Sequence, residues 1–390
     1  MINLILLLRK ILIALSIGAL FAATTACNVD PSITGTGTVL NTSAPVPVAL
    51  LIPQSDENTQ EIAISLENAA RLAMADLGNI RIDLRVYDTA GSAVVAGQVA
   101  QQAVDEGAKI ILGPLFAEAA NAAGLAVTDE GVNVLSFSNN ASIAGGNVFV
   151  LGQTFDNTAK RLVQFAAAQG KQRAVIVHPT NVEGEFGRIA LEKAASRSSL
   201  AVVASQTFEF SREGVVNSVP LVRAAVEIED ADLLFLTSTT AGALGLLVQM
   251  LPEAGINSEI VQYAGLARWD IPAQNLELPG VQGGWFAVPD REKLARFSAR
   301  YEEAYKSKPH HLAGLAYDGI AAVGALVFST GQHALSKGSL TQQAGFEGVD
   351  GIFRLKHSGT NERGLAIARV ENKQVEIIDP APTSFGRAGY

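Results

Sequence analysis

From Val48 onward, short apolar runs alternate with amphipathic segments, and this alternation constrains the fold more than any other feature of the sequence. Val48–Ile52 predicts a buried strand, and apolar residues at helical spacing predict a helix over 61–77. Alternation at this spacing is typical of βαβ units, in which helices cover both faces of a parallel sheet. The same pattern continues, with strands expected at 82–87, 109–112 and 132–137 and helices at 93–105 and 117–127.

The alternation starts again near residue 174, which predicts a second sheet of the same kind. Ligands in open parallel sheets bind outside the carboxyl ends of the strands. Two such sheets in series therefore predict two similar α/β lobes whose strand ends frame a cleft. The second set comprises strands expected at 174–177, 200–205, 233–236 and 260–262, with helices at 187–195, 216–226 and 241–251. Two late helices, 290–306 and 312–328, precede strands expected at 352–355, 364–370 and 375–378.

The N-terminus predicts export and a lipid anchor. Residues 1–26 carry the basic pair Arg9-Lys10 and then an apolar run, 11–23, which is too short for a comfortable membrane span, so this stretch is expected to be a signal peptide. The segment ending in Cys27 resembles the lipobox of bacterial lipoproteins, with Cys27 as the lipidated residue. Asn28, in place of an aspartate, favours the outer membrane over the inner one. Residues 27–47 are polar and rich in Gly, Ser, Thr and Pro, which predicts a flexible tether.

The net charge and the absence of catalytic and metal-binding motifs argue against several functional classes. A formal net charge of −9 argues against binding of nucleic acid or anionic lipid by general electrostatics. The histidines form no HExxH pair, and the adjacent His310 and His311 are poorly placed to share one metal ion. Neither a nucleophile elbow nor a phosphate-binding loop occurs. We therefore expect a protein that is not an enzyme and that holds neither a metal nor another cofactor.

Several ordered segments resemble the type I periplasmic binding proteins of the leucine/isoleucine/valine class. They correspond to strand ends and helix starts of that family: Val48–Pro53, Tyr87–Gly91 with Ala96 and Ala100, Ile110–Leu115, Gly131–Ser136 and Ala316–Asp318. The resemblance implies two Rossmann-like lobes joined by three crossings, near 153–157, 285–289 and 345–350. It also implies that 48–154 and 288–346 form the first lobe, that 155–287 and 347–380 form the second, and that 381–390 is a tail.

The resemblance also suggests which residues bind a ligand. They are the residues of the loops after the strands: Ser55, Phe116, Ser138, Asn139, Asn140, Phe186, Thr239, Arg268 and Trp269. Amino-acid-binding members use a hydroxyl near the position of Phe116 and a tyrosine where this chain has Phe186. They also place an acidic residue after the last strand of the second lobe, where 263–266 has none. Because a buried ammonium without an acceptor is costly, a standard free amino acid is a doubtful ligand.

Two functions follow from the resemblance. In the first, the chain is the receptor of an ABC importer, closes on a small amino-acid-like solute and delivers it to the permease. In the second, it is similar to the penicillin-binding-protein activator lipoproteins, which regulate peptidoglycan synthases by direct contact. Segments 267–270, 282–286 and 348–353 resemble that second branch.

Overall fold

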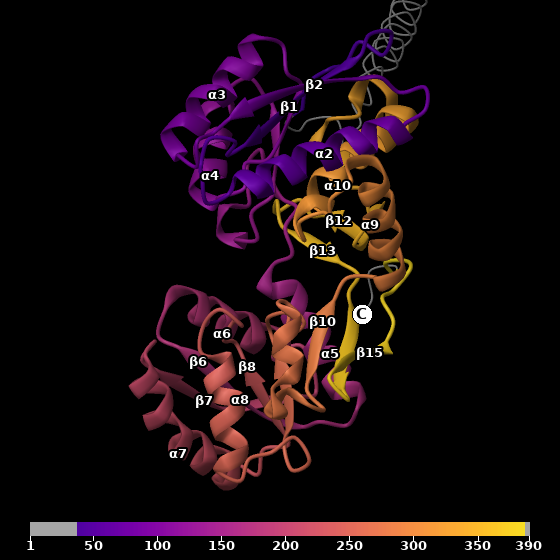
Figure 1. Ribbon diagram of the computed structural model, residues 1–390. Helices are drawn as coiled ribbons and strands as arrows, with labels where there is room; N and C mark the ends of the chain where they lie inside the picture. Colours follow the sequence, from indigo (N-terminus) through magenta and orange to yellow (C-terminus); the bar gives the residue numbers. More distant parts are fainter. Residues whose placement is uncertain (1–36, 387–390) are drawn as a thin grey trace, which may run out of the picture. The chain divides into compact units, whose positions relative to one another are not determined.

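The computed structural model describes residues 37–386, which contain three β-sheets (Figure 1). The predicted signal peptide, residues 27–36 of the predicted tether, which include Cys27, and the last four residues of the tail lie outside the described residues. The tether predicted over 27–47 is too long, because Leu40 is buried in the core of the first sheet and its N–H donates to the carbonyl of Gln332 at 2.9 Å. The α/β architecture with mainly parallel sheets that we expected is confirmed.

The first sheet has the strand order β2-β1-β3-β4-β5, and all its strands are parallel. Alternate residues of its central strand point to opposite faces, as in any pleated strand. Leu50 and Ile52 pack with helices α2 and α10, whereas Ala49 and Leu51 pack with α3 and α4, so helices cover both faces (Figure 1). The strands are β1 (Val46–Ile52), β2 (Ile82–Asp88), β3 (Ile110–Leu112), β4 (Asn133–Ser136) and β5 (Val148–Val150).

Local sequence explains where one helix of this sheet begins. The side chain of Ser92 accepts a hydrogen bond from the backbone N–H of Val95 and so caps α3.

Helix α10 has long apolar stretches on most of its surface, and eleven of its residues are buried. By length and composition α10 is the one helix in 37–386 that could cross a membrane, yet it is a core helix packed against α2. The helices beside the first sheet are α2 (Gln60–Asp76), α3 (Ala93–Asp105), α4 (Ala117–Ala126) and α10 (Ala313–Thr330).

The second sheet has the order β15-β14-β10-β9-β8-β6-β7, in which only β14 and β15 run antiparallel to their neighbours. Its two faces form separate core clusters: Val175 and Val177 pack with α7 and α8, and Ala174 and Ile176 pack with α5 and α6. The strands are β6 (Arg173–Pro179), β7 (Ala201–Phe208), β8 (Leu233–Leu236), β9 (Gln262–Gly265), β10 (Trp285–Val288), β14 (Ala366–Glu371) and β15 (Gln374–Asp379).

Side-chain caps begin three of the helices beside the second sheet, whereas α8 has no such cap. Thr154, Asn181 and Ser211 each accept a hydrogen bond from a backbone N–H in the first turn of α5, α6 and α7. The helices are α5 (Phe155–Ala168), α6 (Val182–Ala195), α7 (Arg212–Ile228) and α8 (Leu244–Glu253). The prediction missed α5, β5 and β10 entirely, although the apolar spacing of Phe155, Ala159 and Leu162 was available as a signal for α5.

The C-terminal third differs from the prediction at the third crossing. After β10 the chain forms α9 (Arg291–Tyr305), which packs on α2, and then α10. The small antiparallel sheet that follows comprises β11 (Phe346–Gly348), β12 (Gly351–Leu355) and β13 (Asn361–Arg363). Phe353 and Leu355 belong to the core of the first sheet, because they pack with its strands and with α10. The return to the second sheet therefore lies at 364–365 and not at 345–350, and 347–380 is divided between the two cores. The other lobe boundaries stay a prediction.

Candidate functional site

A cavity of about 490 Å³ contains the loops that follow β3, β4 and β9, together with residues from the late part of the chain. We call it the Arg268 cavity. Its walls are largely apolar, and its polar side chains are Thr59, Ser138, Asn139, Gln153, Arg268, His311, Asp350 and Arg363. The apolar side chains are Ile62, Leu115, Phe116, Phe137, Ile271, Leu312, Leu315 and Leu365. Its position at the carboxyl ends of parallel strands is the one at which α/β sheets bind ligands.

Ser138 and Asn139 supply neutral hydrogen-bonding groups to this cavity. The Ser138 hydroxyl accepts a hydrogen bond from the backbone N–H of Asn140 at 3.1 Å, which leaves its own proton free to donate. The backbone N–H of Ser138 is fixed in turn by the hydroxyl of Ser136, at 3.1 Å. The loop after β4 is therefore held in place by its own side chains.

Charged groups face the same cavity. Arg268 donates from Nε to one oxygen of Asp270 at 2.6 Å and from Nη2 to the other, so this ion pair engages one edge of the guanidinium. The Asp350 carboxylate accepts no hydrogen bond from another residue in 37–386. Burial raises the pKa of Asp350, and the positive charges of Arg363 and Arg268 oppose that rise. The cavity thus contains both a guanidinium with free donors and a carboxyl group with free acceptors.

A second arginine lies beside Asp350 and is almost wholly buried. Arg363 donates from Nε and Nη2 to the carbonyl oxygen of Leu151, at 2.9 and 2.5 Å. Its Nη1 lies 3.6 Å from Oδ2 of Asp318, which is fully buried. The other oxygen of Asp318 accepts the backbone N–H of Val349 at 2.8 Å. This cluster connects α10 to the segment after β11 and holds Asp350 at the cavity.

His311 contributes a neutral ring to the Arg268 cavity. Burial lowers the pKa of His311 to about 4, and the nearby His310 and Arg268 add to the effect. The imidazole is therefore uncharged at neutral pH and can donate or accept a hydrogen bond. It does not add to the positive charge of Arg268.

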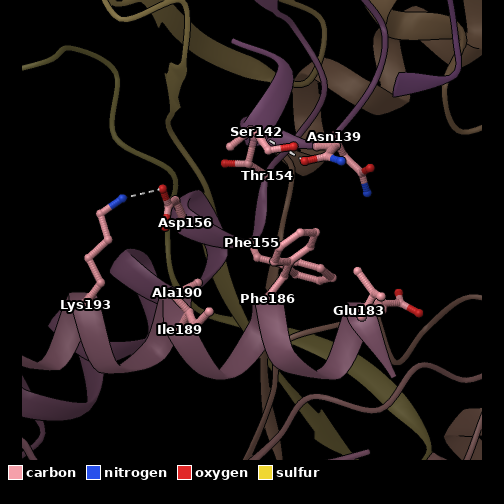
Figure 2. Close-up of a pocket in the computed structure, with 13 residues that line it drawn as sticks. Asn139, Ser142, Thr154, Phe155, Asp156, Glu183, Phe186, Ile189, Ala190 and Lys193 are labelled. Carbon is pink, nitrogen blue, oxygen red and sulfur yellow. Dashed lines mark hydrogen bonds and ion pairs between the residues drawn. The ribbon is translucent and has the colours of Figure 1, made fainter. Parts of the chain in front are cut away.

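A second cavity, of about 450 Å³, adjoins the first, because Asn139 lines both. We call it the Phe186 cavity. Figure 2 shows the rings of Phe155 and Phe186 side by side, with Asn139 and Thr154 beyond them. At one end Lys193 donates to Asp156 at 2.7 Å. This cavity offers an apolar surface with a polar rim.

The predicted ligand-binding residues are divided among these places. Phe116, Ser138 and Arg268 line the Arg268 cavity, Asn140 and Phe186 line the Phe186 cavity, and Asn139 lines both. Ser55 and Thr239 lie in neither. The backbone N–H of Ser55 donates to Asp88 at 3.2 Å, and the carbonyl of Thr239 accepts the N–H of Gly242 in a turn before α8. A role in ligand binding stays a prediction for the residues that line the cavities.

The prediction for Trp269 is corrected by its environment. Its side chain is fully buried in the core beneath the second sheet and stacks on Phe286, with ring centroids 6.2 Å apart. Gly265 and Gly284 make room for the indole, since a Cβ on either would lie within 2.2 Å of it. Trp269 is therefore a packing residue, although it directly follows Arg268 at the end of a strand.

We expect Trp269→Phe to lower the free energy of unfolding by about 1 to 3 kcal/mol, because the smaller ring leaves a void in a closely packed core. Urea unfolding measures this change. A variant as stable as the wild type would contradict the assignment of Trp269 to the core.

Asp350, Arg363 and His311 are site residues that the sequence analysis did not identify. An acidic partner was expected only in the loop after β9, at 263–266. The structure supplies that carboxyl group from the segment after β11, about 85 residues further along the chain. The only sequence signal for Asp350 was an acidic residue in the turn Val349-Asp350-Gly351, and an acidic residue in a turn does not by itself indicate a ligand site.

Comparison with known proteins shows the family to which this chain belongs. A family model described as "Periplasmic binding protein" matches residues 45–374. A branched-chain amino acid ABC transporter periplasmic ligand-binding protein from Burkholderia xenovorans LB400 is 18% identical, with a TM-score of 0.70 over 87% of this chain and 94% of that one.

Two further solved structures have similar folds and contain ligands. An ABC transporter substrate-binding protein from Desulfitobacterium hafniense in complex with Leu is 16% identical, with a TM-score of 0.65 over 86% of this chain and 100% of that one. A solute-binding protein from Rhodopseudomonas palustris BisB5 in complex with 3,4-dihydroxybenzoic acid is 17% identical, with a TM-score of 0.60 over 87% and 97%. No curated protein sequence matches. Because the family model covers most of the chain, this protein belongs to the periplasmic binding protein family.

Proposed function

We propose that this protein is the solute receptor of an ABC importer and binds a small organic acid that has an apolar body and a neutral hydrogen-bond donor. One observation carries the proposal: Arg268 and Asp350 face the same cavity of about 490 Å³, between apolar walls. Pockets of roughly 300–1,000 Å³ with a few convergent polar groups are typical of small-molecule sites.

The acid group of the ligand fits the Arg268 end of the cavity. Nη1 of Arg268 has no partner among the described residues, and Ser138 and Asn139 line the same cavity with a free hydroxyl proton and an amide. Hydrogen bonds between a guanidinium and a carboxylate are about twice as strong as those between neutral groups. These groups together provide both charge and orientation for a carboxylate.

The donor group of the ligand fits Asp350. A hydroxyl can donate to this carboxylate without further cost, whereas an ammonium would also meet the positive charges of Arg268 and Arg363. The carboxyl group that a free amino acid requires is therefore present, but its surroundings favour a neutral donor. Relatives that hold leucine and 3,4-dihydroxybenzoic acid show that the family accommodates both kinds of acid.

The location follows from the predicted anchor. Lipidation of Cys27 would hold the protein at the periplasmic side of a membrane, with the outer membrane favoured, and the residues between Cys27 and the buried Leu40 would give it reach. Closure on the ligand by contacts from both sheets would present a distinct form to the permease. The protein itself would perform no chemistry.

Thermal unfolding of the purified protein against a panel of solutes tests this function. The panel contains small aliphatic and aromatic acids, hydroxy acids, standard amino acids, sugars and muropeptides. A ligand at 100 times its dissociation constant stabilises the native state by about 2.7 kcal/mol, which shifts the unfolding temperature measurably. We expect hits among hydroxy acids. A flat panel with a well-folded protein would contradict solute capture and favour a regulator of peptidoglycan synthases.

Arg268→Gln is expected to weaken binding of the acid at least tenfold, because a hydrogen bond to a charged group contributes about 1.5 to 3 kcal/mol. Isothermal titration with the best hit measures this. The double variant Arg268→Gln/Asp270→Asn tests whether the loss comes only from the freed negative charge of Asp270. Arg223→Gln, on an exposed face of α7, is the matched control and should bind as the wild type does. Unchanged affinity in Arg268→Gln would exclude Arg268 as the carboxylate partner.

A further inference from the structure

A third cavity, of about 440 Å³, lies outside the Arg268 cavity and shares no residue with it. It is formed by α5, α6 and the turn between β12 and β13, and it borders the Phe186 cavity through the α5 start and one face of α6. We call it the basic pocket. Its polar side chains are Thr154, Asp156, Asn157, Lys160, Gln164, Lys193, Arg197, Ser198, Lys356, Ser358, Thr360, Asn361 and Glu362.

The pocket has two positive charges in excess. Four lining side chains are cationic, namely Lys160, Lys193, Arg197 and Lys356, and two are carboxylates, so 4 − 2 leaves +2. The whole chain, by contrast, has a formal net charge of −9. Positive charge of this density on an acidic protein is a local feature and not a consequence of composition.

Both carboxylates of the pocket already have partners. Lys193 donates to Asp156 at 2.7 Å, and Glu362 pairs with Lys160 and also with Arg354, whose Nη2 lies 2.6 Å away. The side chains of Arg197 and Lys356 have no hydrogen-bond or ion-pair partner within 37–386. Two cations without a direct ion-pair partner among the described residues therefore line one cavity.

Direct contacts hold the walls of the pocket together. Asn157, in the first turn of α5, donates to the side-chain oxygen of Asn361 at 2.6 Å. Asn361 in turn donates to the carbonyl oxygens of Val150 and Gly152, at 2.9 and 2.8 Å. The β12–β13 turn is thus fixed against α5, and the pocket is preformed. The N-terminus of α5, where the helix dipole favours negative charge, forms part of the wall.

The charges of the pocket also act on its own groups. Burial lowers the pKa of Lys356; the negative charge of Glu362 opposes this shift, and repulsion by Lys160 and Arg354 adds to it. Burial raises the pKa of Glu362, but hydrogen bonds from Lys160 and Arg354 outweigh this and bring it down to about 2. The surroundings therefore favour negative charge, which a bound anion would supply.

We propose that the basic pocket binds an oxyanion of the phosphate type, either free or as the monoester of a larger solute. Two excess positive charges match a dianion better than a monocarboxylate. Arg197 presents a planar set of donors suited to phosphate oxygens, and Lys356 adds a point charge from the β12–β13 turn. The hydroxyls of Ser358 and Thr360, which share one hydrogen bond at 2.8 Å, line the same pocket and leave one proton between them for a further oxygen.

Occupation of the pocket would connect the β12–β13 turn with α6. Helix α5 begins just after the chain leaves the first sheet, and β13 directly precedes its return to the second. A dianion between Arg197, which lies just after α6, and Lys356 on the β12–β13 turn would hold the β12–β13 turn more firmly against the end of α6. Phosphate should therefore raise the unfolding temperature without entering the Arg268 cavity.

Titration with inorganic phosphate, followed by thermal unfolding and by calorimetry, tests the proposal. We expect millimolar phosphate to raise the unfolding temperature above the value in sodium chloride or acetate of equal ionic strength. Glycerol 3-phosphate serves as the ester arm: stronger binding than phosphate would indicate a phosphorylated solute, and weaker binding would indicate free phosphate. No phosphate effect beyond that of ionic strength would overturn the proposal.

Variants locate the site. Lys356→Gln/Arg197→Gln should weaken phosphate binding at least tenfold, whereas Lys308→Gln, an exposed lysine on another face, should leave it unchanged. The double variant should also keep the wild-type affinity for a ligand of the Arg268 cavity, which shows that it is folded. Undiminished phosphate binding in a folded double variant would refute the assignment to this pocket.

Discussion

Replacing Arg363 with leucine is expected to lower the free energy of unfolding by about 3 to 5 kcal/mol, the usual cost of removing one partner from a buried ion pair. Arg363 is almost fully buried, and it satisfies the carbonyl of Leu151 as well as facing Asp318. Leucine would leave that carbonyl without a donor and Asp318 without a nearby cation. Urea unfolding at a fixed pH measures the difference.

The pH dependence of the stability lost in Arg363→Leu shows whether the loss comes from the unpaired charge of Asp318 or only from lost packing. Asp318 can escape its unfavourable state in Arg363→Leu by taking up a proton, so the loss should be larger at pH 8 than at pH 5. The double variant Arg363→Leu/Asp318→Asn should recover part of the lost stability, because the buried carboxylate is gone. Arg223→Leu, which removes an exposed helix ion pair, should cost well under 1 kcal/mol. Equal effects of the two leucine variants would contradict the importance of the buried cluster.

Asp318 should make the protein less stable as the pH rises from about 4 to about 7. Burial raises the pKa of Asp318 to about 7, and the charge of Asp350 contributes to the rise. Since its pKa when unfolded is near 3.9, the folded state binds more protons than the unfolded state within this window. The stabilising contribution of Asp318 is therefore fully present below the pKa of the unfolded state, and it is lost as the pH rises through the pKa of the folded state.

Asp318→Asn isolates this contribution. An asparagine still offers an oxygen to the backbone N–H of Val349 but does not titrate. The difference in unfolding free energy between wild type and Asp318→Asn should change by several kcal/mol between pH 4 and pH 8, in favour of the variant at high pH. Asp129→Asn, at an exposed position, is the control and should follow the wild-type profile. Parallel profiles for wild type and Asp318→Asn would show that Asp318 titrates normally.

The close approach of Gly348 to Asp318 shows how tightly this cluster is built. A Cβ on residue 348 would lie 2.5 Å from a carboxylate oxygen of Asp318, so only glycine fits there. The same cluster positions the neighbouring Asp350 at the Arg268 cavity. Stability and ligand recognition therefore depend on one short segment. Arg363→Leu and Asp318→Asn should also be tested for ligand binding.

Periodicity in the sequence predicted the elements that carry strong apolar patterns. Val48–Ile52 is almost the whole of β1, and the helix expected at 93–105 coincides with α3. Such elements are predictable because burial on one or both faces determines their pattern. Short strands such as β5 and β13 have three residues each, too few for any period to be detected.

The third crossing could not be placed from local pattern. Whether Phe353 packs with the first or the second sheet depends on contacts with α10 that are distant in sequence. The same limitation applies to the site. Phe116, Ser138 and Arg268 were predicted because they directly follow strands, whereas Asp350 reaches the same cavity from a distant turn. Trp269 also follows a strand, as Arg268 does. Its ring nevertheless packs in the core, because Gly265 and Gly284 leave space for it there.

Isothermal titration with a matched acid and amide is the most direct test of the proposed ligand class. The two compounds, for example a hydroxy acid hit and its primary amide, have the same shape and differ in the negative charge that Arg268 would receive. We predict that the acid binds at least tenfold more tightly than the amide at pH 7, because the amide cannot form a charge-assisted pair with the guanidinium. Equal affinities, or tighter binding of the amide, would contradict a carboxylate site in the Arg268 cavity.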